Sequence, residues 1–168
     1  ARPSPASPLG ESAVYHARLD QLAASATFRV TLGDAQRATG NLRMLAVPVV
    51  ELIGEVEPPG YTQRLREPIA GGHTQLTVLE GSVLRLGVRC ANKPLQAAWI
   101  VLSPADERIA LEAAHEDRRE WLMPRGLREL RRDTEFEIQV SDVDGVALRH
   151  PLHGTIRLER DQPPRAEL

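Results

Sequence analysis

The chain of 168 residues is 42% hydrophobic and 26% charged, which is typical of a globular domain and too apolar for an intrinsically disordered chain. Its formal net charge of -2 provides no positive field for nucleic acid or anionic lipid, so neither is expected as a partner. Cys90 is the single cysteine, which excludes an intramolecular disulfide, and no apolar run approaches the ~20 residues of a membrane span.

The N-terminal part of the chain predicts a linker followed by a few strands. Residues 1–12 are rich in proline, serine and alanine and contain no apolar signal-peptide region, so any export signal is expected outside this chain. A short strand is predicted over residues 14–19. A better one is predicted over residues 27–32, where apolar and polar residues alternate. After a turn at Gly33-Asp34, the return strand is predicted over residues 42–47.

Seven or eight short strands, separated by turn residues, are predicted after Pro48. They cover residues 49–57, 75–79, 83–90, 97–102, 108–113, 120–123, 134–141 and a final run containing Thr155, Ile156 and Leu158. Residues 64–72 are predicted as a loop. Leu127 and Leu130 have helical spacing and predict one helical turn over residues 126–132. Many short strands at this spacing predict an all-β fold, a β-sandwich of the immunoglobulin class.

The last predicted hairpin has a counterpart near the N-terminus. Residues 19–34 align without a gap on residues 127–142 at a shift of 108 (136 − 28 = 108), which places Phe28 on Phe136. After the turn, residues 42–44 align on residues 156–158. Any two amphipathic strands resemble each other, but the matching leucine spacing ahead of the strand favours an internal repeat, and internal repeats indicate tandem modules.

The repeat predicts the domain organisation. Residues 1–47 are interpreted as a linker and the C-terminal strands of a preceding, partial immunoglobulin-like module, and residues 48–168 as a complete immunoglobulin-like β-sandwich. A three-stranded remnant cannot close a sandwich alone, so we expect this chain to be a piece of a longer protein. The alternative is that the N-terminal strands pack on the second module.

The order of the turn motifs carries a resemblance to a known family. These motifs are Glu57-Pro58-Pro59-Gly60-Tyr61-Thr62, Leu79-Glu80-Gly81-Ser82-Val83, Ala91-Asn92-Lys93-Pro94-Leu95, Ser141-Asp142-Val143-Asp144-Gly145 and Asp161-Gln162-Pro163-Pro164. Their succession resembles the uncharacterised immunoglobulin-like repeats of large membrane-anchored extracytoplasmic proteins of planctomycetes and related bacteria, although Gln63 stands where those repeats usually have glycine. The resemblance implies an exported location, anchored through sequence outside this chain, and repeated modules. It implies no catalytic residues and no cofactor.

The candidate metal ligands lie in the final hairpin, namely Asp142, Asp144, His150 and His153. Carboxylates suit calcium and imidazoles suit zinc, so the set matches neither metal well. The alternative is that Asp144-Gly145 makes the turn and that Asp142 accepts hydrogen bonds from nearby backbone N–H groups. No metal site is therefore predicted.

Other candidate residues also have simpler structural interpretations. Cys90 is expected to be a small buried residue, and Trp99 and Trp121 are expected to pack in the fold rather than to form a sugar-stacking platform. The arginines between Arg118 and Arg132 are interleaved with acids, which is typical of a solvated, ion-paired face. No nucleophile elbow, phosphate-binding loop, dinucleotide fingerprint or zinc-protease helix is present, so no enzyme activity is predicted.

The sequence therefore favours a non-catalytic structural or protein-interaction module of a larger extracytoplasmic bacterial protein. The expected partners are another protein or a cell-wall component, together with neighbouring modules of the same polypeptide. The alternatives are a carbohydrate- or cell-wall-binding module and an accessory domain of a larger enzyme. A sugar-binding platform requires Trp99, Trp121 or Tyr61 exposed together on one face.

Overall fold

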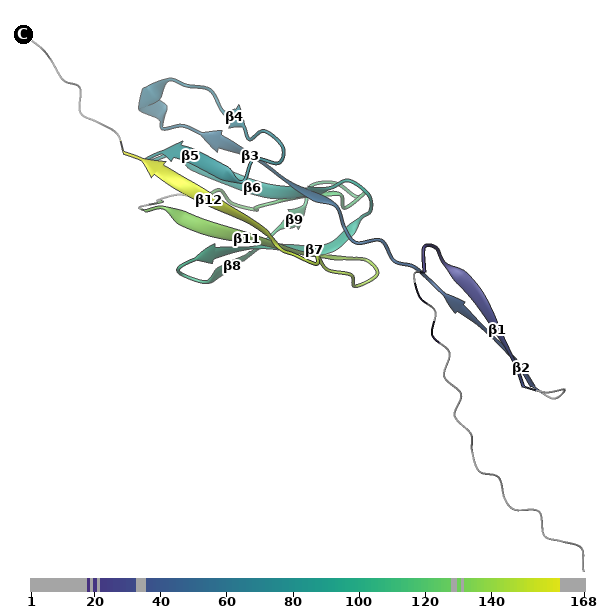
Figure 1. The fold of residues 1–168 in the computed structure, drawn as a ribbon. Coiled ribbons are helices and arrows are strands. Elements are labelled where there is room, and N and C mark those ends of the chain that lie inside the picture. Colours follow the sequence, from purple (N-terminus) through teal and green to yellow (C-terminus); the bar gives the residue numbers. More distant parts are fainter. Residues whose placement is uncertain are drawn as a thin grey trace, which may run out of the picture. The chain divides into compact units, whose positions relative to one another are not determined.

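A computed structural model of the chain describes residues 18, 20, 22–32, 36–127, 130 and 132–160. The chain divides into two compact units, residues 1–44 and residues 45–168, with the boundary close to the predicted one after Val47. The described parts of both units consist of strands and connections, with one 3-10 helix, η1 (Gly60–Thr62), and no α-helix (Figure 1). The predicted all-β class is therefore confirmed. The predicted strand over residues 14–19 lies outside the described residues, apart from Arg18.

Unit 2, residues 45–168, contains two five-stranded sheets. Sheet I has the order β4-β3-β6-β10-β9 and is formed by β4 (Glu67–Pro68), β3 (Val50–Glu57), β6 (Val83–Cys90), β10 (Glu120–Leu122) and β9 (Glu112–Ala113). Sheet II has the order β5-β12-β11-β7-β8 and is formed by β5 (Gln75–Leu79), β12 (Leu152–Glu159), β11 (Thr134–Asp142), β7 (Leu95–Ser103) and β8 (Glu107–Ala110). All neighbouring strands are antiparallel except β5 and β12, which are parallel.

The two sheets of unit 2 form two layers that enclose one hydrophobic core (Figure 1). Alternation along each strand decides which side chains enter the core, because successive side chains point to opposite faces of a sheet. The fully buried side chains of the core include Leu52, Leu84, Leu86 and Val88 of sheet I and Ile100, Ile138 and Ile156 of sheet II. Each such side chain contributes about 1.5–3 kcal/mol relative to an exposed one. This two-layer arrangement fits a β-sandwich.

One predicted strand is divided between the two sheets. Residues 108–113 were expected to form a single strand, but β8 pairs with β7 in sheet II and β9 pairs with β10 in sheet I. Leu111 lies between them, buried, and its backbone N–H donates to the carbonyl oxygen of Ala98 at 2.9 Å. The chain therefore crosses from one layer to the other at a single buried leucine. The predicted loop over residues 64–72 also contains a strand, β4, which forms one edge of sheet I.

The predicted helical turn over residues 126–132 is wrong for the described residues of that segment. Leu127 forms an antiparallel bridge with Leu84, with hydrogen bonds in both directions at 2.7 and 3.0 Å. Both backbone groups of Leu127 are therefore engaged with sheet I and are unavailable to a helix. The spacing of Leu127 and Leu130 instead places two partly buried side chains against the core.

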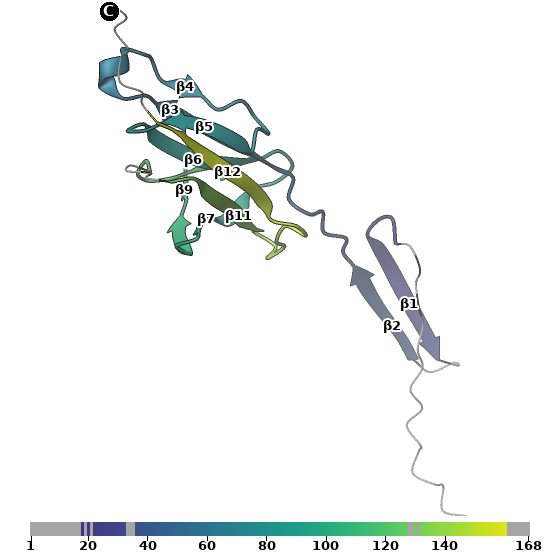
Figure 2. The ribbon, with the colours of Figure 1, turned by 60° about the vertical axis from the view of Figure 1, so that its left-hand side comes forward.

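In the described part of unit 1, residues 1–44, β1 (Ala26–Leu32) and β2 (Gln36–Leu42) form an antiparallel hairpin (Figure 2). The strand predicted over residues 27–32 is confirmed. The return strand predicted over residues 42–47 is wrong, because Leu32 pairs with Gln36 and the chain returns directly. Two of the three residues on the apolar side of β2 are the small Ala38 and Gly40, and only Leu42 is strongly hydrophobic, so the alternation is too weak for the strand to be recognised.

Hairpins β1–β2 and β11–β12 each place a phenylalanine directly opposite a glycine. Phe136 of β11 pairs with Gly154 of β12, and Phe28 of β1 pairs with Gly40 of β2. A Cβ atom at either glycine would overlap the phenylalanine ring opposite, and at Gly154 it would also overlap the carbonyl oxygen of Thr74. Glycine is therefore required at these positions so that the ring can lie against the backbone of the opposite strand.

Candidate functional site

The polar cluster that the structure brings together in unit 2 is centred on Asp142, at the end of β11. Asp142 is buried, with 1% of its surface exposed. Its Oδ1 atom accepts hydrogen bonds from the backbone N–H groups of Asp144 and Val146, both at 2.8 Å, and its own N–H donates to the carbonyl oxygen of Val146 at 3.0 Å. Gly145 follows in the left-handed conformation, with φ of 78°. The alternative interpretation of Asp142, as an acceptor for nearby backbone N–H groups, is confirmed.

Lys93 supplies the charge that balances Asp142. This lysine, the only one in the chain, lies in the turn between β6 and β7, and its Nζ atom donates to Oδ2 of Asp142. The same Nζ atom is 3.9 Å from Oδ2 of Asp144. The two paired side chains are 14% and 0% exposed, respectively, so water screens the pair only weakly. Lys93 therefore connects the turn before β7 to the loop between β11 and β12.

Hydrogen bonding keeps the carboxyl group of Asp142 ionised. Burial alone raises the pKa of Asp142, but the hydrogen bond from Lys93 and those from the backbone of Val146 and Asp144 outweigh it. The net result is a pKa below the ordinary aspartate value of 3.8. A carboxylate that accepts several hydrogen bonds and faces an ammonium group is stable in its charged form even when buried.

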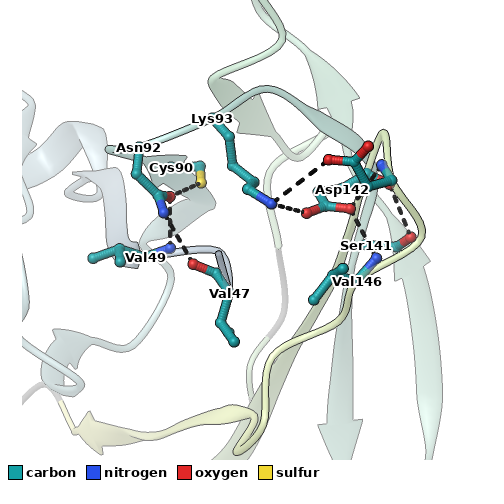
Figure 3. Close-up of polar contacts among 9 residues, drawn as sticks. Val47, Val49, Cys90, Asn92, Lys93, Ser141, Asp142 and Val146 are labelled. Atoms are coloured by element: carbon teal, nitrogen blue, oxygen red, sulfur yellow. Dashed lines mark hydrogen bonds and ion pairs between the residues drawn. The ribbon is translucent and has the colours of Figure 1, made fainter. Parts of the chain in front are cut away.

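Asn92, the residue before Lys93, holds the first residues of unit 2. Its Nδ2 atom donates to the carbonyl oxygen of Val47 at 2.9 Å, and its Oδ1 atom accepts from the backbone N–H of Val49 at 2.9 Å. The same Oδ1 atom accepts from Sγ of Cys90 at 3.3 Å. Figure 3 shows Asn92 directed toward Val47 and Val49, and Lys93 directed toward Asp142. We call Asn92, Lys93 and Asp142 the turn clamp.

The turn clamp joins three segments that are far apart in the sequence. Asn92 binds the segment before β3, and Lys93 binds the loop after β11, so two consecutive residues hold both. Both carboxylate oxygens of Asp142 and both polar atoms of the Asn92 amide are used within the clamp. The turn clamp therefore has a structural role, because the polar side-chain atoms of Asn92, Lys93 and Asp142 already bind other groups of the protein.

The structure does not bring the four candidate metal ligands together. Asp142 and Asp144 both lie beside Lys93, whereas His153 pairs with Glu137 in the register of β11 and β12. Its Nδ1 atom is 3.9 Å from Oε2 of Glu137. Five positions of strand separate Glu137 from Asp142, about 16 Å at the usual rise per residue. His150 is exposed in the loop between the strands, and within the described residues no group of three potential ligands could hold a metal.

The aromatic residues lie on different parts of unit 2. Trp121, on β10 of sheet I, packs against the core, and its Nε1 atom donates to the carbonyl oxygen of Arg118 at 3.0 Å. Trp99 lies on β7 of sheet II, on the opposite face from buried Ala98 and Ile100, and the guanidinium of Arg108 lies 4.4 Å from its ring centre. Tyr61, the third residue of the predicted sugar-binding condition, lies in η1 and is 63% exposed. The two tryptophans lie in different sheets, so they do not meet the condition of exposure together on one face.

A shallow hollow borders Trp99 on sheet II. Its volume is about 290 Å³, and Gln139, Ala147, Leu148 and Pro151 contribute to its lining. The ring that borders it is already stacked against Arg108. The hollow is therefore lined by a single aromatic ring, that of Trp99, which already contacts Arg108, and not by the cluster of exposed rings that a sugar-binding platform requires.

A scan against protein-family models finds no match for this chain, and a search of the curated proteins finds none either. Within the described residues, no helix has the length and the apolar content needed to cross a membrane. The function is therefore argued from the geometry of the two units.

The sequence identified one end of the turn clamp and missed the other. Asp142 and Asp144 were recognised as a pair, but their partner Lys93 lies 49 residues away along the chain, and no local pattern connects them. One signal was present, because a single lysine among many arginines stood within a turn motif. Asn92 gave no such signal, since an asparagine before Lys93-Pro94 is sufficiently explained by the turn itself.

Replacing Lys93 by methionine tests the electrostatic part of the clamp. Lys93→Met leaves the buried carboxylate of Asp142 without its counter-charge, so we expect the free energy of unfolding to fall by about 3 kcal/mol. Equilibrium unfolding in urea measures the change. Arg125→Met, at an exposed position, is the control and is expected to change the free energy by less than about 0.5 kcal/mol.

A second substitution separates two effects of Lys93→Met, namely the loss of the charge partner of Asp142 and the loss of packing by the lysine side chain. Adding Asp142→Asn to Lys93→Met removes the unpaired charge and retains an oxygen that accepts from Asp144 and Val146. The double variant is therefore expected to recover at least about 1 kcal/mol relative to Lys93→Met. If Lys93→Met itself unfolds like the wild type, the pair contributes nothing to stability and this description of the clamp is wrong.

The lowered pKa of Asp142 predicts an acid-dependent loss of stability. Because the folded-state pKa lies below the unfolded value, the unfolded chain binds more protons between the two values, and stability rises with pH there. The contribution of Asp142 is complete above about pH 5 and is lost as the pH falls through the folded-state pKa. The difference in unfolding free energy between the wild type and Asp142→Asn is expected to shrink over that range. A difference that is constant from pH 6 to pH 2 would contradict the assignment.

Proposed function

We propose that this chain is a non-catalytic structural module of a larger extracytoplasmic bacterial protein, in which immunoglobulin-like sandwiches follow one another in tandem. Unit 2 would be one complete sandwich of that series, and hairpin β1–β2 would belong to the module before it. The observation that carries this proposal is the correspondence between hairpin β1–β2 and hairpin β11–β12.

The correspondence extends over every paired position of β11 and β12. The shift of 108 residues that aligns the two sequences before the turn places Ala26 on Thr134, Phe28 on Phe136 and Val30 on Ile138. Their partners across the hairpin are Leu42, Gly40 and Ala38 in the first copy, and Ile156, Gly154 and Leu152 in the second. Leu42, aligned on Ile156 from sequence alone, thus stands at the equivalent position of the two ladders. The shared Phe–Gly pair is the strongest element, because a glycine in a strand usually weakens it.

The form of unit 2 supports an immunoglobulin-like sandwich. Its two sheets are built almost wholly from antiparallel strands that enclose one core, as in that class of fold. The clamp supports a place in a series, because Asn92 fixes Val47 and Val49, which lead into β3, to the body of unit 2.

Two experiments on stability and binding test the proposal. A structural module is expected to fold by itself, so residues 45–168 should unfold in one cooperative transition with the Tm of unit 2 in the full chain. The full chain should show no change in Tm when cell-wall fragments or oligosaccharides are added. A ligand at 100 times its Kd stabilises by about 2.7 kcal/mol, which raises the Tm of a domain this size by several degrees. An increase with oligosaccharides would replace the proposal by the carbohydrate-binding alternative.

A further inference from the structure

We infer that hairpin β1–β2 is a strand-docking surface, and that its partner is a β-sandwich body of the same kind as residues 48–125 of this chain. This inference rests on the proposed function, because it identifies the partner from the second copy of the hairpin. The body would pair an antiparallel strand with β1 and cover the apolar face of the hairpin.

One face of hairpin β1–β2 is apolar and the other is polar. Residues opposite one another in an antiparallel pair point to the same side of the sheet. The apolar face therefore carries Ala26, Phe28, Val30, Ala38, Gly40 and Leu42, and the polar face carries Thr27, Arg29, Thr31, Thr39 and Asn41. On the polar face, Oγ1 of Thr27 donates to Oδ1 of Asn41 at 3.0 Å. Such a hairpin is built to cover a core with one face and to meet water with the other.

The apolar face of hairpin β1–β2 is exposed, whereas the same face of β11–β12 is buried. Phe28 is 40% exposed and its counterpart Phe136 is 2% exposed; Val30 is 44% exposed and its counterpart Ile138 is fully buried. The two hairpins thus share a pairing pattern and differ in how far this face is covered. An isolated two-stranded hairpin is marginally stable in water, so this one gains stability when its face is covered.

The edges of the two hairpins differ in the same way. In unit 2, β11 pairs with β7 on its outer side, with Phe136 opposite Leu102 and Ile138 opposite Ile100, and β12 pairs with β5. In the described part of unit 1, the sheet consists of β1 and β2 alone. Within the described residues, no strand pairs with the outer backbone groups of β1, and adding a strand is the usual way in which such a sheet edge binds a polypeptide.

The environment of β11–β12 specifies the chemistry of the partner. The strand added to β1 should be antiparallel and should direct small and branched apolar side chains toward Phe28 and Val30, as β7 directs Ala98, Ile100 and Leu102 toward the core. The strand added to β2 should be parallel, as β5 is to β12. A second sheet resembling β3 and β6 should cover the ring of Phe28. These requirements together describe a sandwich body that lacks its closing hairpin.

An extended chain tests the inference directly. Residues 48–125 are placed immediately before Arg18, which is the position that the shift of 108 residues assigns to them (126 − 108 = 18). Hydrogen–deuterium exchange is then measured for β1 and β2 in the extended chain and in the 168-residue chain. We expect exchange in β1 and β2 to slow by about 100-fold or more in the extended chain, approaching the protection of β11 and β12. Unchanged exchange, or an added body that stays unfolded, would overturn the inference.

A matched variant shows whether the added protection depends on the position of the Phe28 ring over Gly40. Exchanging the residues at positions 40 and 41 (Gly40→Asn with Asn41→Gly) preserves composition but places a Cβ atom where the Phe28 ring lies. The variant extended chain should lose most of the added protection, while β11 and β12 keep theirs. If the 168-residue chain itself shows protected β1 and β2 and elutes as a dimer, the partner is a second copy of this hairpin and the inference is wrong.

The two proposals fail in different measurements. Binding of oligosaccharides to the 168-residue chain would remove the proposed structural function and would leave the protection of β1 and β2 in the extended chain unaffected. Unprotected β1 and β2 in the extended chain would remove the docking surface, even if unit 2 folds alone and binds no oligosaccharide.

Discussion

A phenylalanine ring that lies against the backbone of the opposite strand requires glycine beneath it, and hairpins β1–β2 and β11–β12 both satisfy that requirement. In unit 2 the Phe136 ring lies over Gly154 and is buried. The strands that carry this pair occupy the centre of sheet II, between β5 and β7. The same pair at Phe28 and Gly40 occurs on a two-stranded hairpin, where the ring is partly exposed. The same Phe–Gly pair therefore occurs with a buried ring at Phe136 and a partly exposed ring at Phe28.

The turn clamp fastens the hairpin that carries the buried pair. Asp142 closes the loop after β11 through backbone N–H groups, and Lys93 connects that loop to the turn before β7. Neighbouring Asn92 binds the chain on either side of Pro48. A buried ion pair adds little stability over an apolar pair, but it penalises every arrangement in which one charge is left alone. The clamp thus specifies which segments meet at this end of unit 2.

Sequence reasoning predicted the strands with regular alternation and failed where long-range pairing decides. β5 and β6 have the predicted bounds, because turn residues flank clearly alternating runs. β2 was misplaced because its polar sequence forms a strand only through its register with β1. Leu127 was assigned to a helix because its spacing to Leu130 suits one, whereas its bridge to Leu84 is visible only in three dimensions. In the clamp, local turn chemistry revealed Asp142, and Lys93 was missed because the pair is remote in sequence.

One Phe–Gly arrangement is built twice in this chain. The proton NMR spectrum of the 168-residue protein tests this repetition, because a ring stacked on a glycine shifts the resonances of its α-protons upfield. We expect upfield α-proton shifts at both Gly154 and Gly40, with cross-peaks from the rings of Phe136 and Phe28, respectively. Unshifted α-protons at Gly40 and no cross-peak to Phe28, beside a shifted Gly154, would contradict it.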